Sequence, residues 1–464
     1  MKLTLFFKLL IFHVVLAIVV FVFKPLALAY FLFIIVFFSY KILMASKKYK
    51  TFYVLLACAY IVGIEVFLRM NNGTVFYEAS KYLVIVFFIM GLISNSFSNK
   101  SLIYILYILL LIPGIFVAVS EMGFETDIRR AIAFNLSGPI CLGITAVFCY
   151  KRTVSFNQIK LILLALLLPI ISMTVYLFLF TPDLQSVVTG TESNFMTSGG
   201  FGPNQVATVL GIGIFILATR FFMSKEAFLY RFFDLALLGI LSYRALITFS
   251  RGGVLTAVVM ILFFIALYYL KVNTKAKFRI KFSMFVFLIM LFLTWMISSI
   301  KTSGFLEKRY ANQDAAGRVK EDVTTGRTDL VAFEFNEFID NPFLGIGVGK
   351  VKEERLNETG VEAASHNEMS RIVAEHGLLG VFAFLILLLT PLVFRIKNKT
   401  NMFFYSFYIF WLLTINHSAM RIAAPAFIYG LCLLNITYES RKPKKIDEGK
   451  MASHVIVSDI KMSR

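Results

Sequence analysis

Residues 161–180 read LILLALLLPIISMTVYLFLF and carry no charged side chain. An α-helix rises about 1.5 Å per residue, so about twenty residues cross a hydrocarbon core roughly 30 Å thick. The stretch does not alternate apolar and polar residues, as the strands of a membrane barrel do. It therefore predicts a membrane-spanning helix inside an apolar run at about 159–181.

The composition extends this prediction to most of the chain. Of 464 residues, 59% are hydrophobic, 51 are Phe, and only 16% are charged. These values exclude a soluble globular domain and a largely disordered chain. We expect an all-α polytopic membrane protein with about 12–14 transmembrane helices. The fourteen candidate spans lie at about 4–23, 25–44, 51–68, 82–98, 101–119, 131–149, 159–181, 204–222, 232–249, 252–270, 282–300, 377–395, 402–418 and 422–438.

The basic residues cluster in alternate loops between these runs. Lys47 and Lys48, then Lys151 and Arg152, fall on one side of the membrane if the N-terminus is cytoplasmic, and the intervening short loops carry few positive charges. Cytoplasmic loops are enriched in Lys and Arg. The net charge of +19 thus predicts an N-in/C-in membrane protein and no nucleic-acid partner.

Two long polar segments, 182–203 and 301–376, interrupt the pattern, and both fall outside the cytoplasm in this topology. The second holds ten Lys or Arg and fourteen Asp or Glu, unlike the cytoplasmic loops. We therefore expect a transmembrane body of about eleven spans, one large periplasmic loop domain, C-terminal transmembrane helices and a polar cytoplasmic tail. Their bounds are 1–300, 301–376, 377–438 and 439–464.

The outer loop contains two patterns typical of helices. Val331, Phe335 and Phe338 share one helical face, and Asn341-Pro342 is expected to end that amphipathic helix. Ser365 and Glu368 have the spacing of a capping box at the start of a second helix. Gly377 then marks either the end of this helix or a kink into the next span.

His366 is the first candidate for chemistry. It is expected in the first turn of the second helix, beside the membrane, where the positive helix end disfavours the imidazolium form. A neutral ring there can accept a proton. The alternative from spacing alone is an ordinary surface histidine near a helix start.

Three arginines are candidates for binding an anion. Arg251 precedes Gly252-Gly253 at a predicted outer membrane edge, and Arg244 lies two helical turns earlier on the same face. Guanidinium groups bind phosphate oxyanions in a forked geometry. Arg327 opens the amphipathic helix. The alternatives are that Arg251 extends to the interface, that Arg244 pairs with an acid on another helix, and that Arg327 lies on a solvated face.

Other patterns do not indicate a cofactor. Gly345-x-Gly347-x-Gly349 follows no strand and lacks a Walker lysine, so it is not a nucleotide loop. The four cysteines lie in apolar runs without disulfide or metal spacing. Glu65 and Arg69 are spaced as an i, i+4 structural ion pair. We expect no metal and no cofactor.

Taken together, several motifs resemble the O-antigen ligase family. They are Gly202-Pro203-Asn204-Gln205, Ser250-Arg251-Gly252-Gly253, Gly326-Arg327-Thr328-Asp329, Asn341-Pro342-Phe343-Leu344-Gly345-Ile346-Gly347, and His366-Asn367. The most specific is His366-Asn367 followed, after nine residues, by Gly377-Leu378-Leu379-Gly380. The motifs cover roughly residues 200–380; family members commonly have about twelve spans, fewer than the fourteen runs here.

The resemblance implies a fold similar to other membrane glycosyltransferases that use polyprenyl phosphates. It implies a metal-independent glycosyltransferase at the periplasmic face of the bacterial inner membrane, with a glycan donor linked to undecaprenyl diphosphate. Arg251 and Arg327 would bind the diphosphate, His366 would activate the acceptor hydroxyl, and Asn367 would position His366 or a sugar hydroxyl. Arg244 is added from spacing alone.

The resemblance leaves the acceptor open. We expect a ligase to lipid A-core; the alternatives are an O-antigen or exopolysaccharide polymerase and a protein O-oligosaccharyltransferase. Outside this class, a transporter of lipid-linked sugars would also have many spans and intramembrane arginines. Such a carrier is expected to show internal repeats, and none is visible.

Overall fold

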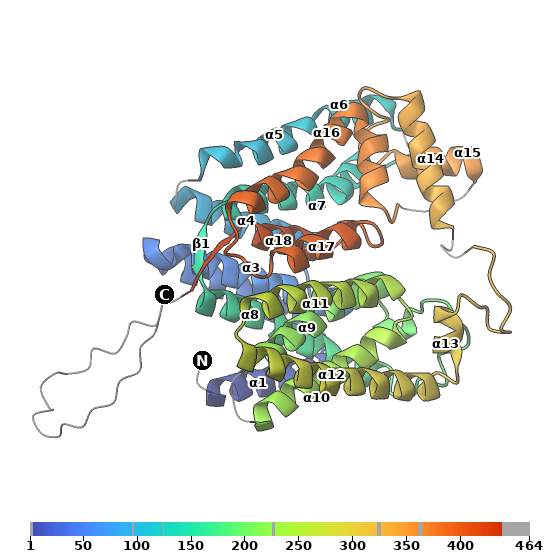
Figure 1. Cartoon of the computed structure of the whole chain (residues 1–464). Coiled ribbons are helices and arrows are strands. Elements are labelled where there is room, and N and C mark those ends of the chain that lie inside the picture. The colour runs from blue at the N-terminus through green and yellow to red at the C-terminus, as the bar shows by residue number, and fades with distance from the viewer. Residues whose placement is uncertain are drawn as a thin grey trace, which may run out of the picture.

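The structure, a computed structural model, describes residues 3–94, 97–123, 125–224, 228–322, 326–360 and 365–438. These parts of the chain are mostly helical, as predicted (Figure 1). The tail 439–464 lies outside them. The α-helices are α1 Leu3–Val22, α2 Leu26–Met44, α3 Lys47–Met70, α4 Ala79–Ser94, α5 Leu102–Leu110, α6 Pro113–Glu121, α7 Ile128–Cys149, α8 Phe156–Phe180, α9 Pro203–Met223, α10 Phe228–Ile247, α11 Arg251–Lys271, α12 Thr274–Lys301, α13 Phe305–Tyr310, α14 Arg327–Asp340, α15 Val351–Thr359, α16 Glu368–Lys397, α17 Phe404–Ile415 and α18 Ala424–Cys432. Two short 3-10 helices, η1 Asn99–Ser101 and η2 Met196–Ser198, and two strands, β1 Thr153–Ser155 and β2 Asn435–Thr437, accompany them.

The protein is a multi-pass membrane protein. Ten segments of the described chain are long and apolar enough to cross a bilayer. They are α1, α2, α3, α7, α8, α11, α12 and α16, together with η1-α5-α6 and η2-α9 read as continuous segments. The all-helical fold class is therefore confirmed.

The remaining four predicted spans fall short of this criterion of length and composition. Helices α4, α17 and α18 have 16, 12 and 9 residues, which is less than the roughly 20 residues that a transmembrane helix needs. Helix α10 is long enough, but Arg231, Asp234 and Arg244 make it too polar for the same criterion.

The two ends of the helical body differ. In Figure 1 the long helices run side by side, with β1 and the start of α1 at one end and α13, α14 and α15 at the other. Strands β1 and β2 pair in parallel, with Thr153 opposite Asn435. The loop next to β1 carries Lys151 and Arg152, two of the residues that predicted the cytoplasmic side.

Helix α3 packs against α8 through a close backbone approach. A Cβ atom on Gly63 would overlap the backbone carbonyl oxygen of Leu166, on α8. Glycine is therefore required at this crossing, despite its lower helix propensity. The contact brings together the two helices that form much of the buried centre.

Charged side chains are also buried at the C-terminal end of α3. The predicted ion pair between Glu65 and Arg69 is confirmed, with a distance of 2.6 Å between Oε1 and Nη2. Lys81 of α4 pairs with Glu78, which lies just before α4. All four side chains are nearly inaccessible to solvent. Such charges are costly unless paired.

Helix α14 is present as predicted and ends at Asp340, next to Asn341-Pro342. Its orientation differs from that of an ordinary amphipathic helix. Glu334 and Glu337 are buried, whereas Phe335 is 56% exposed. Glu334 faces inward because it forms an ion pair with Arg355, with 3.0 Å between Oε1 and Nη2. It also accepts a hydrogen bond from Ser370.

The α3–α8 crossing gives a stability prediction. Gly63→Ala should lower the free energy of unfolding by about 1–3 kcal/mol, the usual cost of overpacking, because the new methyl group meets backbone that cannot rotate away. The control is Gly239→Ala in α10, where the nearest atom to the added Cβ is Met290 Sδ at an ordinary 3.5 Å. Thermal unfolding in detergent should show a loss for Gly63→Ala and little change for Gly239→Ala. Equal stability of both variants would contradict the packing argument.

Candidate active site

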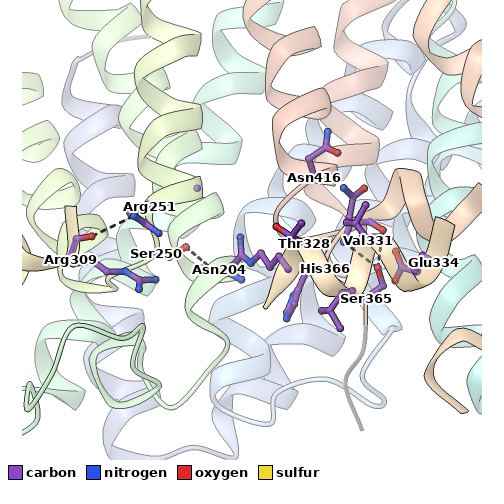
Figure 2. Close-up of a pocket in the computed structure, with 14 residues that line it drawn as sticks. Asn204, Ser250, Arg251, Arg309, Thr328, Val331, Glu334, Ser365, His366 and Asn416 are labelled. Carbon is purple, nitrogen blue, oxygen red and sulfur yellow. Dashed lines mark hydrogen bonds between the residues drawn. The ribbon is translucent and has the colours of Figure 1, made fainter. Parts of the chain in front are cut away.

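A cavity of about 380 Å³ lies where four helices begin, at the end of the body that carries α13–α15. Figure 2 shows Arg251 and Arg309 on one side of it and Thr328, Ser365 and His366 across from them. The cavity thus joins residues that are more than a hundred positions apart in the sequence. Its lining residues are Asn204, Ser250, Arg251, Gly252, Arg309, Arg327, Thr328, Leu330, Val331, Glu334, Ser365, His366, Asn367 and Asn416.

The N-terminal ends of α9, α11, α14 and α16 all contribute to this lining. Asn204 lies in the first turn of α9, Arg251 begins α11, Arg327 begins α14, and Asn367 is the N-cap of α16. A helix N-terminus carries a partial positive charge and unpaired N–H groups, so it attracts anions. Four such ends around one cavity favour a negatively charged ligand.

Three guanidinium groups add full positive charges. Arg251 donates a hydrogen bond to the carbonyl of Arg309 at 3.5 Å, so the two residues are neighbours. Arg327 lines the cavity with them. Burial and then the charges of Arg309 and Arg251 lower the pKa of Arg327. The arginines therefore repel one another electrostatically, which favours an anionic ligand between them.

Arg309 was not predicted from the sequence. It lies on the short helix α13, where its Nε donates to the carbonyl of Phe249 at 3.2 Å. Its Nη1 forms an ion pair with Glu192 at 3.2 Å. No local motif marks Arg309, since only the fold of the segment 301–376 brings it to Arg251. Asn416, from the turn after α17, was missed for the same reason.

Small residues let α9 and α11 approach each other beside the cavity. A Cβ atom on Gly253 would lie 2.5 Å from the carbonyl carbon of Ala207, and one on Gly252 would lie 2.6 Å from the His417 ring. Ser250 Oγ donates to Asn204 Oδ1 at 2.8 Å across the two helix starts. The Ser-Arg-Gly-Gly motif therefore fixes where Arg251 enters the cavity.

His366 lies immediately before the N-cap of α16, one residue earlier than a first-turn position. Its imidazole lines the cavity, and none of the hydrogen bonds found among the described residues involves it. Burial, followed by the charges of Arg421 and Arg327, lowers its pKa to about 4. The neutral ring predicted from the sequence is therefore present near pH 7, mainly because of burial and nearby arginines.

The predicted capping box is wrong. Asn367, not Ser365, is the N-cap of α16, and its Oδ1 accepts hydrogen bonds from Met369 N at 2.9 Å and Ser370 N at 3.3 Å. Ser365 Oγ accepts from Asn367 N at 3.2 Å in a local turn. Glu368 instead pairs with Arg371. Both Ser and Asn are strong N-caps, so their order alone could not decide between them.

Arg244 is not brought to the cavity. Its guanidinium is fully buried and donates to the carbonyls of Leu177 and Thr197 at 3.0 and 3.1 Å. It also lies 5.0 Å from the ring centre of Phe178. These contacts fasten the 182–203 segment to α8 and α10. Helical spacing predicted Arg244 on the same face as Arg251, but α10 ends at Ile247 and α11 begins at Arg251. The two residues lie on different helices, so that prediction is wrong.

The glycine loop 345–349 has a packing role. Gly345, Gly347 and Gly349 all have positive φ angles. The loop's amides bond to the backbone of α16 and α6: Ile346 N to Ala374 O at 3.0 Å and Val348 N to Gly114 O at 3.0 Å. The loop does not line the cavity, in agreement with the rejection of a nucleotide-binding role.

Comparisons with known proteins point to one family. Residues 235–385 match the family model described as O-antigen ligase. The matched segment contains Arg251, Arg309, Arg327 and His366, and it ends beyond Gly380. The comparison with curated proteins gave no match. The family predicted from the sequence motifs is therefore the one that the model identifies.

The capping geometry predicts different effects for two substitutions of Asn367. Asn367→Ala should destabilise the start of α16 by about 1 kcal/mol because two backbone amides lose their acceptor. Asn367→Asp retains a capping oxygen, so thermal unfolding should be close to that of the unmodified protein. If Asn367→Asp is stable but inactive, the amide nitrogen has a separate role in the cavity; equal melting of the Ala variant would exclude the capping role.

Proposed function

We propose that this chain, whose residues 235–385 match the O-antigen ligase family model, is a glycosyltransferase that takes a glycan from undecaprenyl diphosphate and passes it to an acceptor hydroxyl. The observation that supports this most is the cavity itself. Three arginines and four helix N-terminal ends face a neutral histidine there. One wall suits a diphosphate and the other suits an alcohol that must lose a proton.

The arginine wall would hold the donor. As the bond between the anomeric carbon and the diphosphate oxygen breaks, its electron pair stays with the diphosphate, whose negative charge increases. Preorganised positive groups in a water-poor site stabilise that change most. Arg251, Arg309 and Arg327 supply this charge, so we propose transfer without a divalent metal.

His366 would act on the acceptor. The neutral imidazole takes the proton from the acceptor hydroxyl while the acceptor oxygen forms a new bond to the anomeric carbon. Undecaprenyl diphosphate leaves, and the protonated histidine later releases its proton to solvent. A base across the cavity from Arg251 and Arg309 fits a single displacement, in which nucleophile and leaving group lie on opposite sides of the reacting carbon.

We place the cavity at the periplasmic face of the bacterial inner membrane, with both termini in the cytoplasm. The basic loop at Lys151 and Arg152 lies beside β1, and β1 lies at the other end of the body from α13–α15 in Figure 1. Positive loops favour the cytoplasmic side. Membrane lipid would surround the spans and deliver the lipid-linked donor.

The acceptor that we propose is lipid A-core, as in an O-antigen ligase. An O-antigen or exopolysaccharide polymerase and a protein O-oligosaccharyltransferase remain alternatives within the family. A transporter of lipid-linked sugar is a different class; it has no need of a histidine opposite the arginines. Transport of lipid-linked sugar that persists in a His366→Ala protein incapable of transfer would favour that class.

The kinetics of variants should distinguish the proposed donor-binding role of the arginines from the proposed proton-accepting role of His366. Arg251→Lys keeps the charge but loses the forked donor geometry, so we expect transfer to fall by about 100–1000-fold. Arg309→Gln should also weaken donor binding. His366→Ala should leave donor affinity nearly unchanged while transfer falls by roughly 100–10,000-fold.

The measurement is donor affinity and transfer rate on the same purified variants. Arg318→Gln is a suitable control, because Arg318 pairs with Asp314 on the surface and does not line the cavity. A His366→Ala protein that transfers at the normal rate would show that this histidine is structural and would remove the basis of the proposed mechanism.

Deleting the gene should identify the acceptor. We expect loss of long glycans from lipopolysaccharide with accumulation of lipid-linked polymer, because the donor is made but not transferred. Electrophoresis of lipopolysaccharide and of glycoproteins reads this directly. Collapse to single repeat units would instead indicate a polymerase, and loss of glycosylated protein would indicate an oligosaccharyltransferase.

A further inference from the structure

The proposed reaction does not account for a cluster of buried charges, which costs free energy to keep away from water. Glu65, Arg69, Glu78 and Lys81 are buried at the outer ends of α3 and α4, and none of them lines the cavity. Charges at membrane depth are costly to bury and usually serve a function. Their mutual pairing explains how they are tolerated, but it does not explain why they are present.

Three members of this cluster hold the backbone of residues 420–423. Arg69 Nη1 donates to the carbonyl of Arg421 at 3.0 Å. Lys81 Nζ donates to the carbonyl of Met420 at 3.4 Å. The amide of Ala423 donates to Glu65 Oε2 at 2.8 Å. This segment is the turn between α17 and α18, which has few backbone partners of its own.

Neighbouring helices hold the same turn. The amide of Met420 donates to Glu368 Oε2 at 3.3 Å, at the start of α16. A Cβ atom on Gly138, in α7, would lie 2.5 Å from the carbonyl oxygen of Met420. The turn is therefore fixed by α3, α4, α7 and α16 together. Its one long cationic side chain, Arg421, extends toward the site: Nη2 donates to the carbonyl of Ser365 at 2.7 Å.

We propose that Arg421 is a positioning residue for His366, and that the buried charge cluster of α3 and α4 serves to hold Arg421 in place. This inference rests on the proposed function, in which His366 is the base. Ser365 is the residue directly before His366, so a hydrogen bond to its carbonyl fixes the peptide that carries the imidazole. The cluster would then act on the reaction through one side chain that does not touch the substrate.

Arg421 has an electrostatic effect as well as a geometric one. The charged or titratable groups that act on His366 are Arg421 and His417 from the turn, Arg327 from α14 and Arg355 from α15. After burial, Arg421 is the strongest influence that lowers the pKa of His366 to about 4. Removing Arg421 should both loosen the peptide and raise the pKa of the ring toward its ordinary 6.5.

The first test is Arg421→Gln in the full-length protein. Small displacements of a reacting group cost up to about 100-fold in rate, so we expect kcat to fall by about 10–100-fold with the donor KM nearly unchanged. The fall of kcat/KM at acid pH reports the pKa of the base in the free enzyme. This apparent pKa should move upward from about 4. Arg421→Lys, which keeps the charge, should shift this pKa less than Arg421→Gln does.

A second measurement does not depend on activity. Of the two protonation states of histidine, diethyl pyrocarbonate modifies only the neutral one. The rate of modification at His366, followed by mass spectrometry of the peptide that contains it, therefore reports the protonation of the ring. In the unmodified protein this rate should stay level between about pH 5.5 and 7.5, and in Arg421→Gln it should fall toward the acid end of that range. The control is Arg395→Gln, which removes another buried guanidinium bonded to a carbonyl (Asn401 O, 2.9 Å) at the far end of α16.

A third variant tests the cluster. Glu65→Gln removes the partner of Arg69 but keeps an acceptor for Ala423 N, so it should lower kcat in the same way as Arg421→Gln, to a smaller extent. Combined with Arg421→Gln it should add little, because both act through one path. Full additivity would overturn the role assigned to the cluster. This variant also serves if Arg421→Gln does not fold.

The outcomes separate this inference from the proposed function. If His366→Ala is inactive but Arg421→Gln changes neither kcat nor the modification profile, the positioning role is overturned and the proposed function stands. If the profile shifts but His366→Ala is fully active, the proposed function fails and the catalytic role of Arg421 fails with it. A loss of donor affinity equal to the loss of kcat would make Arg421 part of the donor site and would also overturn the inference.

Discussion

The repulsion among Arg251, Arg309 and Arg327 is the constraint on which the rest of the site depends. Four helix N-terminal ends add to the same positive field. Such a site is electrostatically unfavourable when empty, so the fold must hold each group separately. Arg309 is tied to a backbone carbonyl and to Glu192, while glycines fix the approach of Arg251. A diphosphate would relieve this repulsion, and it would do so most when its charge is greatest, during bond cleavage.

The same positive field sets the condition under which His366 can work. It keeps the imidazole neutral, which a base requires, but it also makes the ring a poorer proton acceptor. A bound diphosphate would offset the nearby arginines and thereby raise the basicity of His366. Donor binding and base strength are then coupled through Coulomb interactions alone. In the proposed reaction, the acceptor would be activated most strongly when a donor is already in place.

The sequence could predict features that are set by residues close together in the chain, but not those that depend on contacts between distant segments. Apolar runs gave the helical membrane fold, and motifs gave Arg251, Arg327 and His366, which the structure brings to one cavity. The position of Arg309 depends on how the outer domain folds over α11, which no spacing encodes. The misplaced cap at Ser365, the inward acidic face of α14 and the burial of Arg244 have a common cause. In each, a side chain had two chemically reasonable partners, and only tertiary contacts decide between them.

The most specific motif divides its residues between chemistry and packing. In His366-Asn367 with Gly377 and Gly380, His366 lines the cavity and is the proposed base, while Asn367 caps α16. Gly377, with φ 58° and ψ −139°, breaks the helix where a side chain would meet the backbone of Pro342 and Phe343. Gly380 packs against the carbonyl of Ile372 in the preceding turns. The nine residues between Asn367 and Gly377 are therefore the length of the helical segment that joins the His366-Asn367 motif to the membrane span. A change in that length would rotate His366 away from the arginines even if every motif residue were kept.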